Sequence, residues 1–428
     1  MTEPVAGAAP EWWRQATVYQ IWPRSFADGD GDGVGDLAGV IGHLGYLAEL
    51  GVDALWLSPF YPSPGADMGY DISDYQDVDP LFGDLATFDA LVAGAHRRRL
   101  RVIVDIVANH TSDEHPWFLE SRSSRAAAKR DWYWWRPPRP GFQGGEPGAE
   151  PNNWQSFFGG PTWTYDGASG EYYLHLFDRK QPDLNWENPA VREALFGMMR
   201  WWRDRGVDGL RLDVVNLISK DPALPDGEGG DGFPFYANGP RIHEFLRELR
   251  AAVAPAGNPG GFALIGEMPG ISAEQAVAYT DPERRELDMV FPFDHMDLDH
   301  GAGKFDVLEL APGALADRLA DWQERLGRTG WVGLYLSNHD QPRPASRFGD
   351  GSPAAAKALG LAMHLQRGTA FCYQGEEIGM VNPGFTDVGE LRDVESLRHL
   401  EAGGSLAGVA AMGRDNARLP MQPKSRRC

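Results

Sequence analysis

The chain has 428 residues, of which 42% are hydrophobic and 24% charged, as in a globular protein with a large core and more than one domain. Its formal net charge of −21 argues against nucleic acid or an anionic membrane as a general partner. No apolar run is long enough to span a bilayer, so no membrane association is expected.

The two ends of the sequence and its cysteines indicate the compartment. The segment MTEPVAGAAPEWWRQ lacks the basic start and apolar core of a signal peptide. Only two cysteines occur, Cys372 in an apolar run and Cys428 at the last position, so no structural disulfide is expected. We therefore expect a reducing, cytoplasmic location, while the oligomeric state stays open.

Eight short apolar runs follow one another along the chain, and amphipathic segments such as DLAGVIGHLGYLAELG and IHEFLRELRAAV lie between most of them. Runs of this kind are typical of strands that are buried on both faces. They cover residues 16–23, 52–59, 100–107, 207–215, 261–268, 287–294, 331–340 and 368–377. The alternation predicts an α/β fold with a parallel sheet, and eight units indicate a closed (β/α)8 TIM barrel with insertions.

One long insertion interrupts this alternation after the third strand. It is rich in Trp, Phe, Pro and Gly, as in DWYWWRPPRPGFQGGEPGAEPNNWQSFFGGPTW. A disordered linker is the alternative, but so many large aromatic side chains would be costly to leave in water. We predict a small irregular domain over residues 109–181, with the catalytic barrel formed by residues 1–108 and 182–428.

Polar side chains gather at the ends of four predicted strands. They are Asp105, Asn109, His110, Arg211, Asp213, Glu267, Asn338, His339 and Asp340. Strand side chains alternate, so Arg211 and Asp213 share one face. That pair alone could be a buried ion pair that only orders the core. Catalysis in such barrels takes place at the carboxyl ends of the strands. Polar side chains at four of these ends therefore indicate an active site.

Several carboxylates at one site suit the cleavage of a glycosidic bond. One acid protonates the leaving oxygen, a second carboxylate acts as nucleophile or base, and a third can stabilise a positively charged transition state. The abundant aromatic residues fit the apolar face of a sugar ring.

From Trp12 to Met421 the sequence resembles the alpha-amylase family of glycoside hydrolases, in its alpha-glucosidase and oligo-1,6-glucosidase branch. The motifs that carry the resemblance are DIVANHTSDEHPWF, QPDLNWENP, GLRLDVVN, GEM, SNHDQPR and RDNARLPMQ, in the family's order. The resemblance implies that Asp213 is the nucleophile, Glu267 the general acid/base and Asp340 the group that stabilises the transition state. Arg211 would orient Asp213 and lower its pKa.

The same resemblance implies a closed glucose pocket. Its sugar-binding residues would be Asp67, Tyr70, His110, Phe158, Phe177, Gln181, Arg211, His339 and Arg414. Tyr70 would stack under the glucose, and Asp67 with Arg414 would recognise its non-reducing end.

The residue that follows the nucleophile is informative about which glycosidic linkage the protein cleaves. Relatives that cut alpha-1,6 bonds resemble this chain in having valine there, here Val214, whereas maltose-preferring relatives often have threonine or alanine. The alternative is that Val214 is simply a β-branched strand residue. We expect an exo-acting alpha-glucosidase that favours alpha-1,6 over alpha-1,4 bonds and acts on short alpha-glucosides such as isomaltose, maltose or sucrose, without an organic cofactor.

The stretch DGDGDGVGD, residues 28–36, has acidic residues at alternate positions, which suits a hard cation with oxygen ligands. It is not an EF-hand, because the twelfth position is Gly39 rather than glutamate, and an acidic turn without metal is the alternative. The resemblance implies a structural Ca²⁺. Its ligands would be the side chains of Asp28, Asp30, Asp32 and Asp36 and the carbonyl of Val34.

The C-terminal end departs from the family. Relatives continue past PMQ with a last barrel helix and a β-sandwich, whereas here KSRRC follows after Pro423. We expect both elements to be missing, and a shortened product with an exposed barrel seam is our hypothesis.

Two other functions stay open. A trehalose synthase or sucrose isomerase would use the same three acids for glucosyl transfer, and a non-catalytic, truncated relative would have lost them. Retention of all three acids argues against the second.

Overall fold

The computed structural model describes residues 11–254 and 261–421. Its main sheet has eight parallel strands in the order β10-β11-β1-β2-β3-β7-β8-β9. The strands are β1 (Thr17–Ile21), β2 (Ala54–Leu57), β3 (Arg101–Val107), β7 (Gly209–Asp213), β8 (Ala263–Glu267), β9 (Met289–Phe291), β10 (Gly333–Leu334) and β11 (Thr369–Tyr373). A parallel bridge from Val290 to Val332 joins the two edges. The predicted barrel and all eight predicted strands are confirmed.

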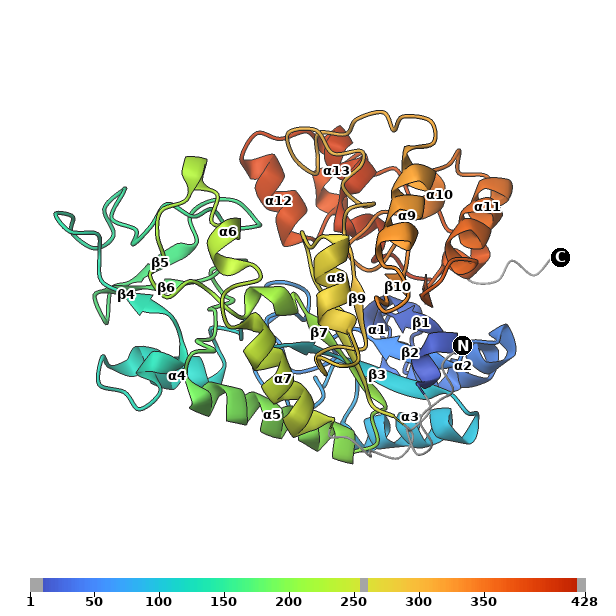
Figure 1. The fold of residues 1–428 in the computed structure, drawn as a ribbon, viewed down its shortest axis with the longest axis horizontal. Helices are drawn as coiled ribbons and strands as arrows, with labels where there is room; N and C mark the ends of the chain where they lie inside the picture. The colour runs from blue at the N-terminus through green and yellow to red at the C-terminus, as the bar shows by residue number, and fades with distance from the viewer. Residues whose placement is uncertain (1–10, 255–260, 422–428) are drawn as a thin grey trace.

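Thirteen α-helices occur in the described residues. They are α1 (Pro23–Phe26), α2 (Leu37–Leu50), α3 (Leu85–Arg97), α4 (Pro116–Ser123), α5 (Pro189–Asp204), α6 (Phe233–Tyr236), α7 (Ile242–Val253), α8 (Ala273–Thr280), α9 (Ala314–Arg325), α10 (Pro344–Arg347), α11 (Pro353–His364), α12 (Val394–Glu401) and α13 (Leu406–Met412). None of them has the length and apolar character needed to cross a lipid bilayer. Figure 1 shows the longer helices around the strands.

Local sequence accounts for where these helices begin. Asp36, Asp84 and Ser352 each accept a hydrogen bond from a backbone N–H in the first turn of α2, α3 and α11, which satisfies a group that the helix leaves free. In α7 the buried residues recur at helical spacing, and they form the stripe that packs on the barrel. The strands β2, β7 and β8 are buried along their whole length, as expected for a sheet covered on both faces.

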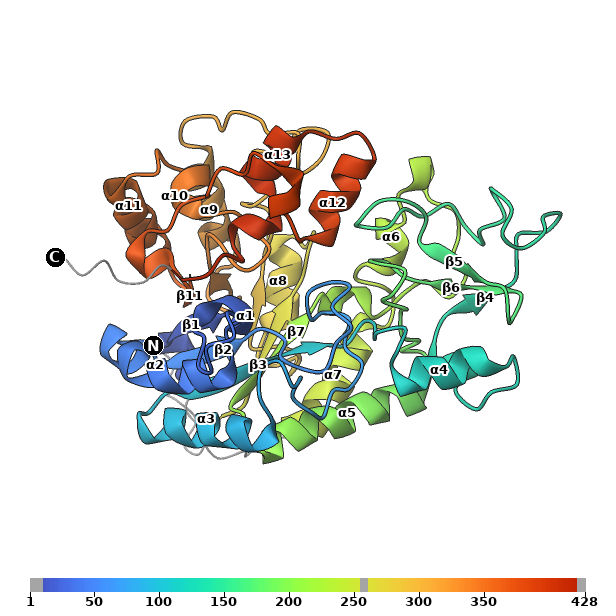
Figure 2. The same ribbon diagram turned by 180° about the vertical axis from the view of Figure 1, so that it is seen from behind.

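A second, antiparallel sheet lies within the predicted insertion. Its strands are β4 (Trp135–Arg136), β5 (Trp163–Asp166) and β6 (Glu171–Leu174), in the order β4-β6-β5. Trp134, Trp154 and Trp163 are buried there in a separate aromatic core, so the aromatic residues of this segment are ordered. Figures 1 and 2 show this sheet at one end of the molecule, with α12 facing it across the carboxyl side of the barrel.

One part of the barrel wall differs from the rest. A groove of about 690 Å³ runs along the outer face of β1 and β11, between α11 and the end of α2. Thr17 and Cys372 lie on its floor, and Leu50 and Leu361, which are 40% and 62% exposed, line its walls. Within the described residues no helix fills this groove. Cys372 is a free, buried cysteine, and Cys428 lies outside the described residues.

Candidate active site

The three acids singled out in the sequence line one cavity. Asp213 is the last residue of β7 and Glu267 the last residue of β8, while Asp340 lies in the turn region that follows β10. All three border the same cavity of about 250 Å³ at the carboxyl end of the barrel. Residues far apart in the sequence therefore meet because parallel strands end at one face of the barrel.

One buried arginine joins the acids. Nη1 of Arg211 lies 2.8 Å from Oδ1 of Asp105 and 2.6 Å from Oδ1 of Asp213, and Nη2 lies 2.6 Å from Oε1 of Glu267. The Arg211 side chain is only 1% exposed. A charge held in a strand would be costly if unpaired, and here three carboxylates offset that cost. The sequence indicated the pair with Asp213 but not the contacts with Asp105 and Glu267.

Burial shifts the pKa of Asp213 more strongly than the charge of Arg211 does. Burial raises the pKa of Asp213, the guanidinium of Arg211 lowers it, and the nearby Glu267 and Asp105 raise it again, so that it stands well above its usual range. The expected effect of Arg211 is present. The prediction that Arg211 lowers the pKa of Asp213 is therefore confirmed as one contribution, although desolvation outweighs it in the net shift.

The pKa of Asp340 is shifted in the opposite direction from that of Asp213. Burial tends to raise its pKa, but His339 and the guanidinium groups of Arg414 and Arg418 hold it well below the usual range. Nη2 of Arg418 lies 2.8 Å from Oδ1 of Asp340, and Nη1 of Arg414 lies 3.4 Å from the same oxygen. Asp340 is therefore ionised at neutral pH. Arg418 was missed in the sequence, although it stands within the quoted RDNARLPMQ motif.

A polar network closes one end of the cavity. Nη2 of Arg414 lies 2.8 Å from Oδ1 of Asp67, and Nε2 of Gln181 donates to Oδ2 of Asp67 at 3.1 Å. Asp393, which the sequence analysis missed, accepts from Nε of Arg414 at 2.7 Å. Burial raises the pKa of Asp67 to about 6, although Arg414 opposes this. Burial also lowers the pKa of His110 to about 4, so that this imidazole is neutral at pH 7.

The predicted sugar-binding residues fall into two groups. Those that line the cavity are Asp67, Tyr70, His110, Phe158, Phe177 and Arg414. Gln181, Arg211 and His339 are buried behind them. Nε2 of His339 lies 2.6 Å from the Tyr70 hydroxyl and 3.1 Å from Asp340, and its ring stacks on that of Tyr70 at 5.1 Å. A direct contact between His339 and a sugar stays a prediction.

Val214 does not belong to the strand. β7 ends at Asp213, and Val214 adopts the left-handed conformation with φ of 36°. Its N–H donates to Oε2 of Glu267 at 3.1 Å, and its side chain lines the cavity. A β-branched residue rarely adopts this conformation, which is typical of functional sites. The alternative explanation by strand propensity is therefore wrong.

Another part of the cavity lining has acidic and basic side chains that the sequence did not indicate. Asp297, His300 and Lys304 follow β9, and Glu395 lies in the first turn of α12. Nζ of Lys304 lies 2.6 Å from Oε2 of Glu395. These residues stand in loops and on a helix without a recognisable motif.

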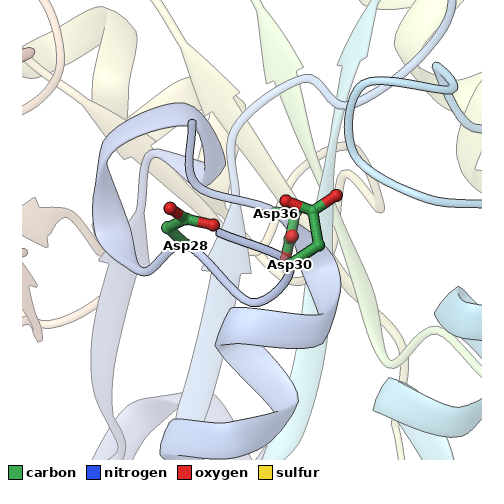
Figure 3. A group of neighbouring side chains, drawn as sticks. All are labelled: Asp28, Asp30 and Asp36. Carbon is green, nitrogen blue, oxygen red and sulfur yellow. The ribbon is translucent and has the colours of Figure 1, made fainter. Parts of the chain in front are cut away.

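The acidic loop after β1 brings three of its carboxylates together. Ligand oxygens of Asp28, Asp30 and Asp36 all lie within 4.8 Å of one another, and Figure 3 shows them around the loop at the start of α2. This donor set fits a hard cation such as Ca²⁺. Oδ1 of Asp32 instead accepts from the Val34 N–H at 2.7 Å, and Asp32 is not part of this cluster. The participation of Asp32 and Val34 stays a prediction.

Comparisons with known proteins agree with this geometry. A family model described as "Alpha amylase, catalytic domain" matches residues 20–427. The chain is 49% identical over 430 residues to an oligo-1,6-glucosidase of Parageobacillus thermoglucosidasius, covering 96% of this chain and 75% of that protein.

Two solved structures are similar over nearly the whole chain. A variant of the trehalose-6-phosphate hydrolase of Bacillus licheniformis has a TM-score of 0.90 and 45% identity, covering 96% of this chain and 74% of that one. The isomaltulose synthase of Erwinia rhapontici NX5 also has a TM-score of 0.90, with 40% identity and coverage of 96% and 75%.

Proposed function

Because this chain belongs to the alpha-amylase family of glycoside hydrolases, we propose that it is a retaining, exo-acting alpha-glucosidase of the oligo-1,6-glucosidase type. The observation that carries the proposal is the meeting of Asp213, Glu267 and Asp340 in one cavity. Its substrates would be short alpha-glucosides such as isomaltose, maltose or sucrose, from which it would release glucose at the non-reducing end.

The mechanism follows from the setting of each acid. Asp213 attacks the anomeric carbon while Glu267 donates a proton to the leaving oxygen, which gives a covalent glycosyl-enzyme. Water then enters, Glu267 removes its proton, and glucose leaves with its anomeric configuration retained. The two carboxylates contact neighbouring nitrogens of Arg211, which supports the short spacing that this mechanism needs. Asp340, held as an anion by Arg418 and Arg414, stabilises the positive charge of the transition state.

Arg211 has two effects on this chemistry. Its charge opposes the desolvation of Asp213 and so favours the ionised nucleophile. It also fixes the orientation of Asp213 and Glu267 through separate nitrogens, while the Val214 N–H holds the other oxygen of Glu267.

The closed end of the cavity supports exo action. Asp67 and Arg414, joined at 2.8 Å, face the position that the far hydroxyls of a bound glucose would take. Arg414 also lies 4.9 Å from the ring of Phe158, so polar and aromatic groups meet there. A chain extended beyond this end would have to displace the ion pair.

The preference for alpha-1,6 bonds rests on Val214. Its side chain lines the cavity beside Glu267, to which its N–H donates, so its shape acts where the leaving sugar departs. The relative with 49% identity is named an oligo-1,6-glucosidase, which supports the same preference.

Transfer of glucose to another sugar is the competing function, since an isomaltulose synthase is similar at 40% identity. The test is release of glucose from isomaltose, maltose, sucrose and p-nitrophenyl alpha-glucoside, with the anomer identified by NMR and Asp213→Asn as control. We expect alpha-glucose, fastest from isomaltose. Isomerised disaccharides as the main product would favour transfer, and a folded but inactive wild type would contradict both.

We also propose that the loop of Asp28, Asp30 and Asp36 holds a structural Ca²⁺. The loop follows β1, and Asp36 caps α2, so the ion would fix the start of that helix and supply no reacting group.

A further inference from the structure

A fully buried ion pair lies where the aromatic-rich insertion returns to the barrel. Nζ of Lys220 lies 2.9 Å from Oδ2 of Asp183, and neither side chain is exposed. Lys220 stands on the segment that follows β7, and Asp183 forms an antiparallel backbone bridge with His110. Burial of two charges is costly, so this pair is weak evidence for stability alone. The mechanism described above uses neither residue of the pair.

The ammonium group of Lys220 has an acceptor for each of its three donors. Besides Asp183, these are Oδ1 of Asn109 at 2.9 Å and the Leu217 carbonyl oxygen at 2.7 Å. An ammonium group only donates, so the Asn109 amide must present its oxygen to Lys220. The amide nitrogen, Nδ2, then donates to Oδ2 of Asp183 at 3.0 Å. The buried ion pair therefore fixes the orientation of this amide from both sides.

The orientation of Asn109 decides the protonation of a neighbouring imidazole. Nδ2 of Asn109 also lies 3.2 Å from Nδ1 of His110. Because an amide NH₂ group only donates, Nδ1 has to accept and carries no proton. Burial lowers the pKa of His110 to about 4, so its ring is neutral at neutral pH and has one proton, which is then on Nε2. The Tyr70 carbonyl, which also acts on this ring as an acceptor, is compatible with such a proton.

A second amide competes for the same ring. Nε2 of Gln181 lies 3.2 Å from Nε2 of His110, and the Gln181 oxygen accepts from the Asp178 N–H, so this amide also turns its NH₂ group to the imidazole. A neutral imidazole accepts at only one nitrogen. Gln181 has another acceptor in Oδ2 of Asp67 at 3.1 Å, whereas the Asn109 amide is held in place by the ion pair. Asn109 should therefore be the amide from which the ring accepts.

We infer that this buried ion pair, acting through Asn109, holds His110 in the tautomer that carries its proton on Nε2. Lys220 and Asp183 are then positioning residues. His110 lines the cavity, and its Nε2 lies next to Gln181 at the closed end, so the ring presents a donor there to an oxygen of the bound sugar. The contact with a sugar rests on the proposed function, whereas the tautomer does not.

The test is the nitrogen NMR spectrum of the whole protein with isotope-labelled histidine rings at neutral pH. The signals of His110 are those that His110→Gln removes, and for the wild type we expect a protonated Nε2 and an unprotonated Nδ1. Asn109→Asp keeps the size of the side chain but replaces the NH₂ group by an oxygen, so it should place a proton on Nδ1. Lys220→Met combined with Asp183→Asn removes both buried charges together, frees the amide to turn, and should give a mixture of tautomers.

The activity should follow the tautomer. We expect kcat/KM for isomaltose to fall about tenfold or more in Asn109→Asp, and less in the double variant. Lys129→Met is the matched control, because it removes another lysine of the insertion, whose Nζ lies 2.5 Å from Oε2 of Glu120. It should leave both the nitrogen signals of His110 and kcat/KM unchanged.

The possible outcomes separate this inference from the proposed function. A wild type with a protonated Nδ1, or the wild-type tautomer retained in Asn109→Asp or in the double variant, would overturn the inference. A changed tautomer with the same kcat/KM would overturn the role of His110 as a donor to the sugar. If the wild type cuts no sugar, the proposed function fails, and the NMR signals of His110 still decide which tautomer the ion pair sets.

Discussion

Nη2 of Arg211 lies 2.6 Å from Oε1 of Glu267, so the guanidinium that pairs with Asp213 also holds the proposed proton donor. The two reacting carboxylates are therefore coupled through one fixed charge. Asp105 takes a third position on the same group and accepts a hydrogen bond from the Tyr70 hydroxyl at 3.0 Å. These groups thus form one continuous polar cluster behind the reacting carboxylates.

Replacing Arg211 by a neutral residue should change the pH dependence of kcat/KM. Arg211 lowers the pKa of Asp213, so Arg211→Gln should raise that pKa and move the acid limb of kcat/KM to higher pH. We also expect kcat/KM at neutral pH to fall by about a hundredfold or more. Arg211→Lys keeps the charge and should move the limb less. An acid limb at the same pH in folded Arg211→Gln would contradict this account.

The fall in kcat/KM on loss of the proton donor should depend on the leaving group. Glu267→Gln cannot protonate the departing oxygen, so kcat/KM for isomaltose should fall about 10²–10⁴-fold. The p-nitrophenolate group leaves without a proton, so kcat/KM for p-nitrophenyl alpha-glucoside should fall much less. Steady-state rates with both substrates give the comparison. Equal losses would mean that Glu267 has another role.

Helix α12 should control binding without taking part in the reaction. Arg398 pairs with Asp178, whose N–H donates to Oε1 of Gln181 at 2.9 Å, and Gln181 in turn donates to Asp67. Arg398→Met should loosen this chain and raise KM for isomaltose about threefold to tenfold, with kcat nearly unchanged. Arg325→Met removes an exposed ion pair with Glu274 on the outer barrel and is the control. A fall in kcat alone would argue against a positioning effect.

The acidic loop should couple metal binding to stability. A ligand that binds only the folded state raises stability by about 2.7 kcal/mol at a hundred times its Kd. We therefore expect Ca²⁺ to raise Tm and EDTA to lower it. Asp28→Asn keeps one of the two oxygens that accept from the Gly31 and Gly33 N–H groups but loses the charge, so its Tm should respond far less to Ca²⁺. If Tm of the wild type is the same with and without Ca²⁺, the loop is an acidic turn without metal.

Linkage preference should follow the side chain of residue 214. Val214→Thr keeps the branched shape and adds a hydroxyl next to Glu267, so we expect the kcat/KM ratio of isomaltose to maltose to fall several-fold. Initial rates of glucose release give that ratio. An unchanged ratio would place the linkage preference elsewhere in the cavity wall.

The sequence predicted the barrel well because its strands are buried on both faces and read as short apolar runs. Asp213 and Glu267 could be placed because each ends such a run. Asp393, Glu395 and Arg398 could not, because charged residues on an amphipathic helix such as α12 have the pattern of a solvated surface. Their role arises from the packing of α12 against the insertion, which no local pattern encodes. The strength of desolvation at Asp213 likewise depends on the completed fold.

The groove along β1 and β11 has a mechanical consequence. The groove borders the outer side of these two strands, whose backbones pair in register from Thr17 to Gln20. Local unfolding of a barrel begins where the least structure packs on its strands. The backbone amides of β1 and β11 should therefore exchange with deuterium sooner than those of β2 and β3. Since Gln20 contacts His339 at 2.8 Å, such opening would reach the base of the cavity directly.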